Sequence, residues 1–203
     1  DLENLLGHIL PEDKAVILDT VGCLTSISYR SIEQSLDWFQ KQFNLTILDR
    51  VLCVSPFAGN AVVRDILWPL SQGSCVVFGD SHFNQSSVSL SCRQWMAKQQ
   101  VSVAHLLPSH LAMMLYEVNP PHLDYLRCVL CSGEPLYSQV VNKFYQQFQC
   151  EFACLYQPLG VSIPVALHMG QAELLGDTYP IGRPTTQGLY ILDENLQPLP
   201  IGL

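Results

Sequence analysis

Short strands rich in valine, leucine and cysteine alternate with amphipathic helices along most of this chain, and this alternation limits the fold more than any other feature. The strands are predicted at residues 15–19, 51–54, 74–78, 101–106, 126–131 and 150–156. The helices are predicted at residues 31–43, 62–70, 89–99, from 108 onwards and at 138–149. Buried strands separated by helices are typical of a parallel sheet covered on both faces. We therefore predict an α/β fold with a mostly parallel sheet flanked by helices.

The predicted organisation changes after Gly160. Strands are predicted at residues 161–168, 179–181 and 189–192 without a long helix between them, followed by a turn at 193–195 and a returning arm. We therefore divide the chain into an α/β part, residues 1–160, and a small β-rich part, residues 161–203. We expect the β-rich part to be incomplete at its C-terminus and the chain to belong to a longer polypeptide.

The segment between the first strand and the following helix is where many α/β proteins bind phosphate, with glycines, hydroxyl groups and a lysine. This segment holds one glycine, and no lysine occurs between Lys14 and Lys41. Its first residues are Thr20, Val21, Gly22, Cys23, Leu24, Thr25 and Ser26. We predict a phosphate loop, running to Ser28, that has lost its binding groups.

Composition excludes several classes of function. A net charge of -8 argues against nucleic acid, whose phosphates require a basic surface. No apolar run approaches the ~18 residues of a spanning helix, and no signal peptide opens the sequence. The eight cysteines are scattered, and the Cys128–Cys131 spacing lies inside a predicted strand, so we expect packed, reduced thiols in a cytoplasmic protein. A hydrophobic content of 48% suggests that neighbouring protein covers part of the surface.

Five segments, in the correct order, resemble the adenylation domain of nonribosomal peptide synthetases, which belongs to the adenylate-forming superfamily. They are residues 48–52, 70–78, 131–136, 180–184 and 189–202. The resemblance implies the second half of an adenylation core, without its first subdomain and its terminal lid domain.

The same resemblance implies that catalytic positions have changed. Residues 156–160 correspond to a Tyr-Gly-Pro-Thr-Glu segment of the family and here read Tyr156, Gln157, Pro158, Leu159 and Gly160. By this correspondence Tyr156 is retained and could stack on a base, Leu159 replaces a phosphate-binding threonine, and Gly160 replaces a magnesium-binding glutamate. No metal site and no cofactor are therefore expected.

The remaining candidate residues form what the resemblance implies is a remnant nucleotide and substrate pocket. Asn60 takes the place of an aspartate that would bind the substrate's amino group, and His105, Gly133 and Glu134 lie in matching segments. His105 is read either as a general base or as a satisfied or solvent-facing histidine. Glu134 is read as a carboxylate at a helix start. No Ser-His-Asp arrangement is predicted, because Ser132 lacks the glycine of a nucleophile elbow two residues earlier.

We therefore predict a non-catalytic adenylation-like domain of a nonribosomal peptide synthetase or a hybrid polyketide synthase. It would serve as a spacer or docking platform between condensation and carrier domains, with self-association through an exposed apolar face as a further option. One alternative is an active or split adenylating enzyme. Another is a ligand-binding module that keeps the old substrate pocket.

Overall fold

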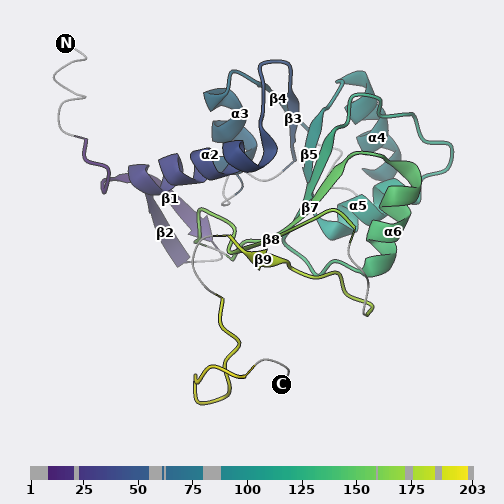
Figure 1. Cartoon of the computed structure of the whole chain (residues 1–203). Coiled ribbons are helices and arrows are strands. Elements are labelled where there is room, and N and C mark those ends of the chain that lie inside the picture. Colours follow the sequence, from purple (N-terminus) through teal and green to yellow (C-terminus); the bar gives the residue numbers. More distant parts are fainter. Residues whose placement is uncertain are drawn as a thin grey trace, which may run out of the picture.

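The computed structural model describes residues 9–20, 23–54, 61, 63–79, 88–158, 160–171, 176–185 and 189–200, and the predicted α/β fold is confirmed (Figure 1). The main sheet has seven strands in the order β4-β3-β5-β6-β7-β8-β9, of which the first five run parallel. The strands are β3 (Arg50–Cys53), β4 (Cys75–Phe78), β5 (Val103–Leu106), β6 (Cys128–Cys131), β7 (Glu151–Tyr156), β8 (Ala166–Met169) and β9 (Arg183–Pro184). The helices are α2 (Tyr29–Phe43), the π-helix η1 (Val63–Leu67), α3 (Trp68–Ser71), α4 (Val88–Lys98), α5 (Pro108–Leu115) and α6 (Ser138–Gln147).

The strands are apolar throughout because both faces of the sheet are covered. Alternate residues of each strand point to opposite faces. Val51 joins a cluster with Phe39, Phe43 and Trp68 under α2 and α3, whereas Leu52 joins the larger cluster under α4, α5 and α6. Figure 1 shows these two helical layers on either side of the sheet.

The same alternation separates the two cysteines with CxxC spacing. Cys128 packs in the cluster under α2, and Cys131 packs in the cluster on the other face. Burial raises the pKa of the Cys128 thiol to about 12 and that of Cys131 well above its ordinary value. The two thiols therefore act as small apolar side chains, and neither of them forms a disulfide.

Helix α2 is defined by its ends as well as by its apolar face. The Ser28 side chain accepts a hydrogen bond from Ser31 N at 3.2 Å, which satisfies a free amide of the first turn. The helix ends at Asn44, whose φ of 45° is left-handed.

The segment predicted as a loop at residues 20–28 is instead mostly strand. β1 (Lys14–Thr20) and β2 (Cys23–Ser28) form an antiparallel hairpin that stands apart from the main sheet (Figure 1). Ile27 of β2 and Leu18 of β1 are buried against Val63. Exposure alternates along β2, but its apolar residues Leu24 and Ile27 are three apart and lie on opposite faces. The prediction was wrong because these residue types show no strand period in the sequence.

The C-terminal strands are shorter than predicted. β8 begins at Ala166 rather than at residue 161, and residues 179–181 are not strand. β8 and β9 extend the main sheet in antiparallel orientation, and Gly182 permits the approach because an added Cβ would lie 2.0 Å from Leu167 O. The division of the chain at residue 160 stays a prediction.

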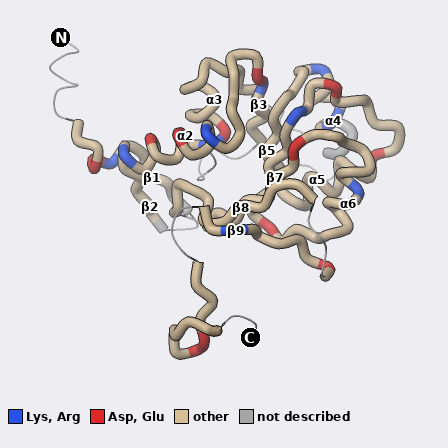
Figure 2. Tube along the Cα trace, viewed as in Figure 1, with Lys and Arg blue, Asp and Glu red and all other residues tan. Residues whose placement is uncertain are grey.

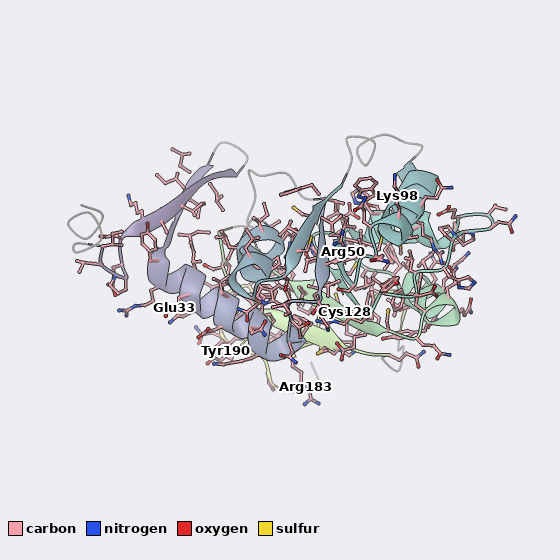
Figure 3. All side chains as sticks on the ribbon, turned by 90° about the horizontal axis from the view of Figure 1, so that it is seen from above. Glu33, Arg50, Lys98, Cys128, Arg183 and Tyr190 are labelled. Atoms are coloured by element: carbon pink, nitrogen blue, oxygen red, sulfur yellow. The ribbon has the colours of Figure 1, made fainter. Side chains whose placement is uncertain are left out.

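The described surface carries few charges and many apolar side chains. Figure 2 shows lysine, arginine, aspartate and glutamate at scattered positions along the trace. Arg183 and Tyr190, which Figure 3 labels, lie at the exposed C-terminal end of the fold. None of the helices in the described ranges has the length and apolar character needed to cross a membrane.

A buried carboxylate holds the amino ends of three parallel strands together. Asp49 accepts hydrogen bonds from Arg127 Nε at 2.7 Å, Ser102 Oγ at 2.7 Å and Thr46 N at 2.8 Å. Burial alone would raise the pKa of Asp49, but these donors and the Arg127 charge lower it to about 2. β3, β5 and β6 begin within one or two residues of this cluster.

We expect Asp49→Ala to lower the free energy of unfolding by about 3 kcal/mol, because it leaves a partly buried arginine without its carboxylate. The wild-type chain should also lose about 2 kcal/mol as pH falls from 4 towards 2, since Asp49 titrates at 3.8 when unfolded and at about 2 when folded. Urea titrations across this pH range measure both effects. A slope in Asp49→Asn as steep as that of the wild type would contradict the assignment.

Candidate functional site

The carboxyl ends of β5, β6 and β7 bring together several residues that the sequence singled out. His105 lies in β5, Gly133 and Glu134 follow β6, and Tyr156 and Gln157 lie at the end of β7. Since the carboxyl ends of neighbouring parallel strands meet at one edge, this is the expected place for a site in such a sheet. The predicted pocket residues Asn60 and Leu159 lie outside the described residues.

Two charged residues that the sequence reading missed enter this edge from η1. Arg64 and Asp65 are 4% and 1% exposed, although they are consecutive in the sequence. The π-helical backbone of Val63–Leu67 widens the turn here, a feature often found at functional sites. Arg64 Nε donates to Asp65 Oδ1 at 2.7 Å, so the two charges are buried as a pair.

Arg64 is also the centre of a hydrogen-bond network that links three strands. Its NH1 group donates to Gln157 Oε1 at 3.0 Å, and its NH2 group lies 2.8 Å from His105 Nδ1. His105 Nε2 in turn lies 2.8 Å from Ser132 Oγ. We call these five side chains, Arg64, Asp65, His105, Ser132 and Gln157, the edge network.

The partners determine where the proton sits on His105. A guanidinium only donates, so Nδ1 must accept from Arg64 and Nε2 must carry the proton that it donates to Ser132. Burial and the Arg64 charge both lower the pKa of His105, in keeping with a neutral ring. For Asp65, burial raises the pKa, but the Arg64 charge outweighs it and holds the pKa well below its usual range.

Ser132, His105 and Asp65 form an arrangement that the sequence did not predict and that superficially resembles a hydrolytic triad. His105 Nδ1 lies 3.6 Å from Asp65 Oδ2, which is too long for a hydrogen bond. In a triad the carboxylate accepts from Nδ1 and Nε2 accepts the serine proton. Here Arg64 reverses both directions, so His105 cannot act as a base towards Ser132. This favours the reading of His105 as a satisfied, buried histidine.

A cavity of about 700 Å³ opens beside the edge network. Its walls come from residues 133–136, 154–158 and 178–181. Gln157 separates the cavity from Arg64, and its Nε2 donates to the carbonyl groups of Val161 and Ser162 at 2.9 and 3.0 Å. The amide of Gln157 is therefore fully used on the protein side and offers the cavity little hydrogen bonding.

Glu134, which also borders the cavity, is committed to a helix. Its carboxylate accepts from Ser109 N at 2.9 Å and from Ser109 Oγ at 3.0 Å, at the start of α5. The expected position of Glu134 at a helix start is therefore observed, although the helix is α5 rather than α6. Gly133 has φ +96°, and a Cβ there would lie 2.8 Å from Leu107 Cδ2, so only glycine fits this turn.

The predicted phosphate and magnesium positions meet at the hairpin. Gly160 lies against Thr25, because an added Cβ would come within 3.2 Å of Thr25 Cγ2 and 3.6 Å of its Oγ1. Gly160 also has φ +81°, which L side chains rarely adopt. Leu24 and Ser26 are exposed on β2, the backbones of Thr20 and Cys23 pair across the hairpin, and Val21 and Gly22 lie outside the described residues.

The sequence held one signal for the missed residues. Arg64-Asp65 is the one charged pair in the apolar run of residues 61–70. The pair was not singled out in the sequence analysis, although Val63 before it is buried and Ile66 after it is half-buried.

Known proteins similar to this chain are large synthetases. Vanchrobactin synthetase VabF of Vibrio anguillarum is 27% identical over 218 residues, which cover 99% of this chain and 8% of that protein. Enterobactin synthase component F of Escherichia coli (strain K12) is 27% identical over 207 residues, or 95% of this chain and 16% of that protein. Polyketide synthase PksN of Bacillus subtilis (strain 168) is 23% identical, with 98% and 4% covered. The chain thus spans a small part of each relative.

Solved structures support the same fold. The Vibrio cholerae adenylation domain AlmE, solved with glycyl-adenosine-5'-phosphate, aligns with a TM-score of 0.81 at 22% identity over 97% of this chain and 38% of that one. The nonribosomal peptide synthetase FmoA3, solved with AMPPNP, gives 0.82 at 22% identity over 93% and 21%.

The order of the strands, the cavity at the carboxyl edge of the sheet and the similar solved structures together define an adenylation-type α/β fold. The family model described as AMP-binding enzyme matches residues 14–203, and the chain belongs to that family. The resemblance to adenylation domains of nonribosomal peptide synthetases is confirmed at this level.

We expect Arg64→Met to lower the free energy of unfolding by about 3 kcal/mol, because it leaves Asp65 as an uncompensated buried charge. The double variant Arg64→Met/Asp65→Leu should recover most of this loss, since apolar side chains of similar volume can replace a buried pair. Urea denaturation of both single variants and the double variant measures the coupling. Additive losses would show that the two charges do not depend on each other.

Proposed function

We propose that this chain is a non-catalytic adenylation-like domain of a nonribosomal peptide synthetase or hybrid polyketide synthase, acting as a spacer or docking platform beside condensation or carrier domains. The observation that carries the proposal is the edge network. Its side chains form hydrogen bonds with one another at the carboxyl edge of the sheet, where a reacting substrate group would need them to be free. Arg64 is neutralised by Asp65, and His105 is held in a tautomer that cannot accept a proton from Ser132.

The hairpin supports the same proposal. A triphosphate is held by converging backbone N–H groups in turn conformation and by a nearby cation. Cys23–Ser28 is extended strand, and no lysine occurs between Lys14 and Lys41. A phosphate group approaching Thr25 would meet extended backbone along Cys23–Ser28 and no lysine from this segment.

The residues present do not fit the magnesium ion that the family would imply. Gly160 supplies no carboxylate, and Thr25 occupies the space next to it. Across the ranges that the structure describes, no three His, Cys, Asp or Glu side chains converge as metal ligands would. We therefore derive no metal-dependent step, since magnesium prefers carboxylate and other oxygen ligands.

A ligand-binding module is the second candidate, and the cavity of about 700 Å³ favours it. Its lining includes Leu136, Leu155, Pro158 and Ile181, and Glu134 and Gln157 are committed elsewhere. Such a cavity would suit an apolar ring or acyl group better than a polyphosphate.

We expect no ATP–pyrophosphate exchange from the purified chain with any amino, aryl or acyl substrate, measured beside an active adenylation domain. Gly160→Glu should gain no magnesium-dependent activity and should lower the melting temperature, because the new side chain meets Thr25 in a left-handed backbone. Exchange above background by the wild type, alone or mixed with the remainder of an adenylation core, would reject the proposal in favour of the active or split enzyme.

Thermal unfolding separates the two remaining candidates. If the cavity binds acyl or aryl groups, octanoate or benzoate should raise the melting temperature in a concentration-dependent way, while ATP with magnesium should not. Ile181→Trp, at an exposed lining position, should narrow the cavity and reduce the shift. Equal melting temperatures with every compound would leave the spacer role as the better account.

A further inference from the structure

A groove of about 410 Å³ lies between the N-terminal part of α2 and the end of α3. Its floor is formed by the half-buried Ile32 and Leu36, and Tyr29 closes one end. Ser71 and Gln72 form the opposite bank. None of these residues belongs to the edge network or to the cavity beside it.

The groove is held open by contacts beneath it. Trp68 Nε1 donates to Gln40 Oε1 at 3.0 Å, and the Trp68 and Phe39 rings pack with centroids 5.3 Å apart. Trp68 and Phe39 are fully buried. The two helices therefore keep their spacing without a partner, and the groove is preformed.

Two exposed carboxylates stand along the α2 bank. Glu33, labelled in Figure 3, and Asp37 are one helical turn apart, and both line the groove. In the described part of the chain neither carboxylate has an ion-pair partner, whereas the nearby Arg30 is paired with Glu12 at 2.6 Å. Like charges at this spacing repel each other, so a cation placed between them would be stabilised by both.

Apolar surface continues from the groove past α3. Leu70, Ile47 and Leu48 are 58%, 75% and 84% exposed, which is unusual for three large apolar side chains near one another. Ile47 lies beside Gly73, because its Cγ2 is 3.3 Å from an added Cβ there, and Gly73 N donates to Leu70 O. The groove and these residues form one apolar strip with an acidic margin.

We propose that this strip binds an amphipathic helix whose polar face carries lysine or arginine residues one turn apart, supplied by a neighbouring domain or a partner chain. Leucine-like side chains would cover Ile32 and Leu36, and the cations would lie against Glu33 and Asp37, which is the helix-in-groove mode of recognition. The net charge of -8 favours approach of a basic partner at long range. This inference rests on the docking role proposed above.

Fluorescence anisotropy with a labelled helical peptide tests the proposal. The peptide carries leucines at i, i+3 and i+7 and two lysines four residues apart that lie beside the leucine stripe, and a matched peptide has glutamate in place of lysine. We expect the wild-type chain to bind the lysine peptide and not the glutamate peptide. Glu33→Gln/Asp37→Asn should weaken binding about tenfold.

The control variant Asp124→Asn/Asp177→Asn removes the same number of charges from exposed positions away from the groove. It should bind the lysine peptide like the wild type. Ser71→Trp, which fills the groove from the exposed end of α3, should reduce binding without loss of folding. Equal weakening in the control variant, or equal binding of both peptides, would overturn the proposal.

Two further outcomes would reject the basic helix as the occupant of the strip. Sedimentation that shows a wild-type dimer, lost in Glu33→Gln/Asp37→Asn, would make a second copy the occupant and reject the basic helix. Failure of the peptide to bind while ATP–pyrophosphate exchange is absent would reject this inference and leave the non-catalytic function standing. ATP–pyrophosphate exchange with peptide binding intact would reject the non-catalytic function and leave the helix-binding inference standing.

Discussion

The buried pair of Arg64 and Asp65 sets the chemistry of the sheet's carboxyl edge. Two charges that are 4% and 1% exposed lose their hydration, and their contact at 2.7 Å offsets part of that cost. Once Arg64 is fixed there, its remaining donors hold Gln157 and His105 in single orientations. The tautomer of His105 and the engagement of the Gln157 amide both follow from this one pair.

The parts of the molecule that keep the fold are separate from this edge. Asp49 and Arg127 join the amino ends of the parallel strands, and the rings of Phe39 and Trp68 pack between α2 and α3. The carboxyl edge could therefore exchange its reactive groups for a structural network without loss of the sheet. This separation gives a physical reason why the fold of the AMP-binding family is compatible with the non-catalytic role that we propose.

The sequence predicted most of the sheet because its strands are buried on both faces and so consist almost wholly of apolar residues. It predicted α2 from its periodicity, since Phe39 and Phe43 share a face. β2 was missed because its apolar residues Leu24 and Ile27 are three residues apart and give no two-residue pattern, and its pairing with β1 is accompanied by burial of Ile27 against Val63. Arg64 and Asp65 were missed because sequence periodicity treats a charge as exposed, and only the three-dimensional partner His105 explains its burial.

The hairpin also connects the two regions with proposed roles, the groove on α2 and the cavity beside the edge network. β1 and β2 pack on Val63, the residue just before Arg64, so the hairpin and the edge network are supported by the same turn of η1. α2 follows directly from β2, and its N-terminal part lines the acidic groove. A partner helix bound to α2 would thus contact the element that joins the hairpin to the sheet. The groove shares no lining residue with the cavity beside Gln157. Docking on one side and ligand binding on the other could then occur in the same molecule without competing for a residue.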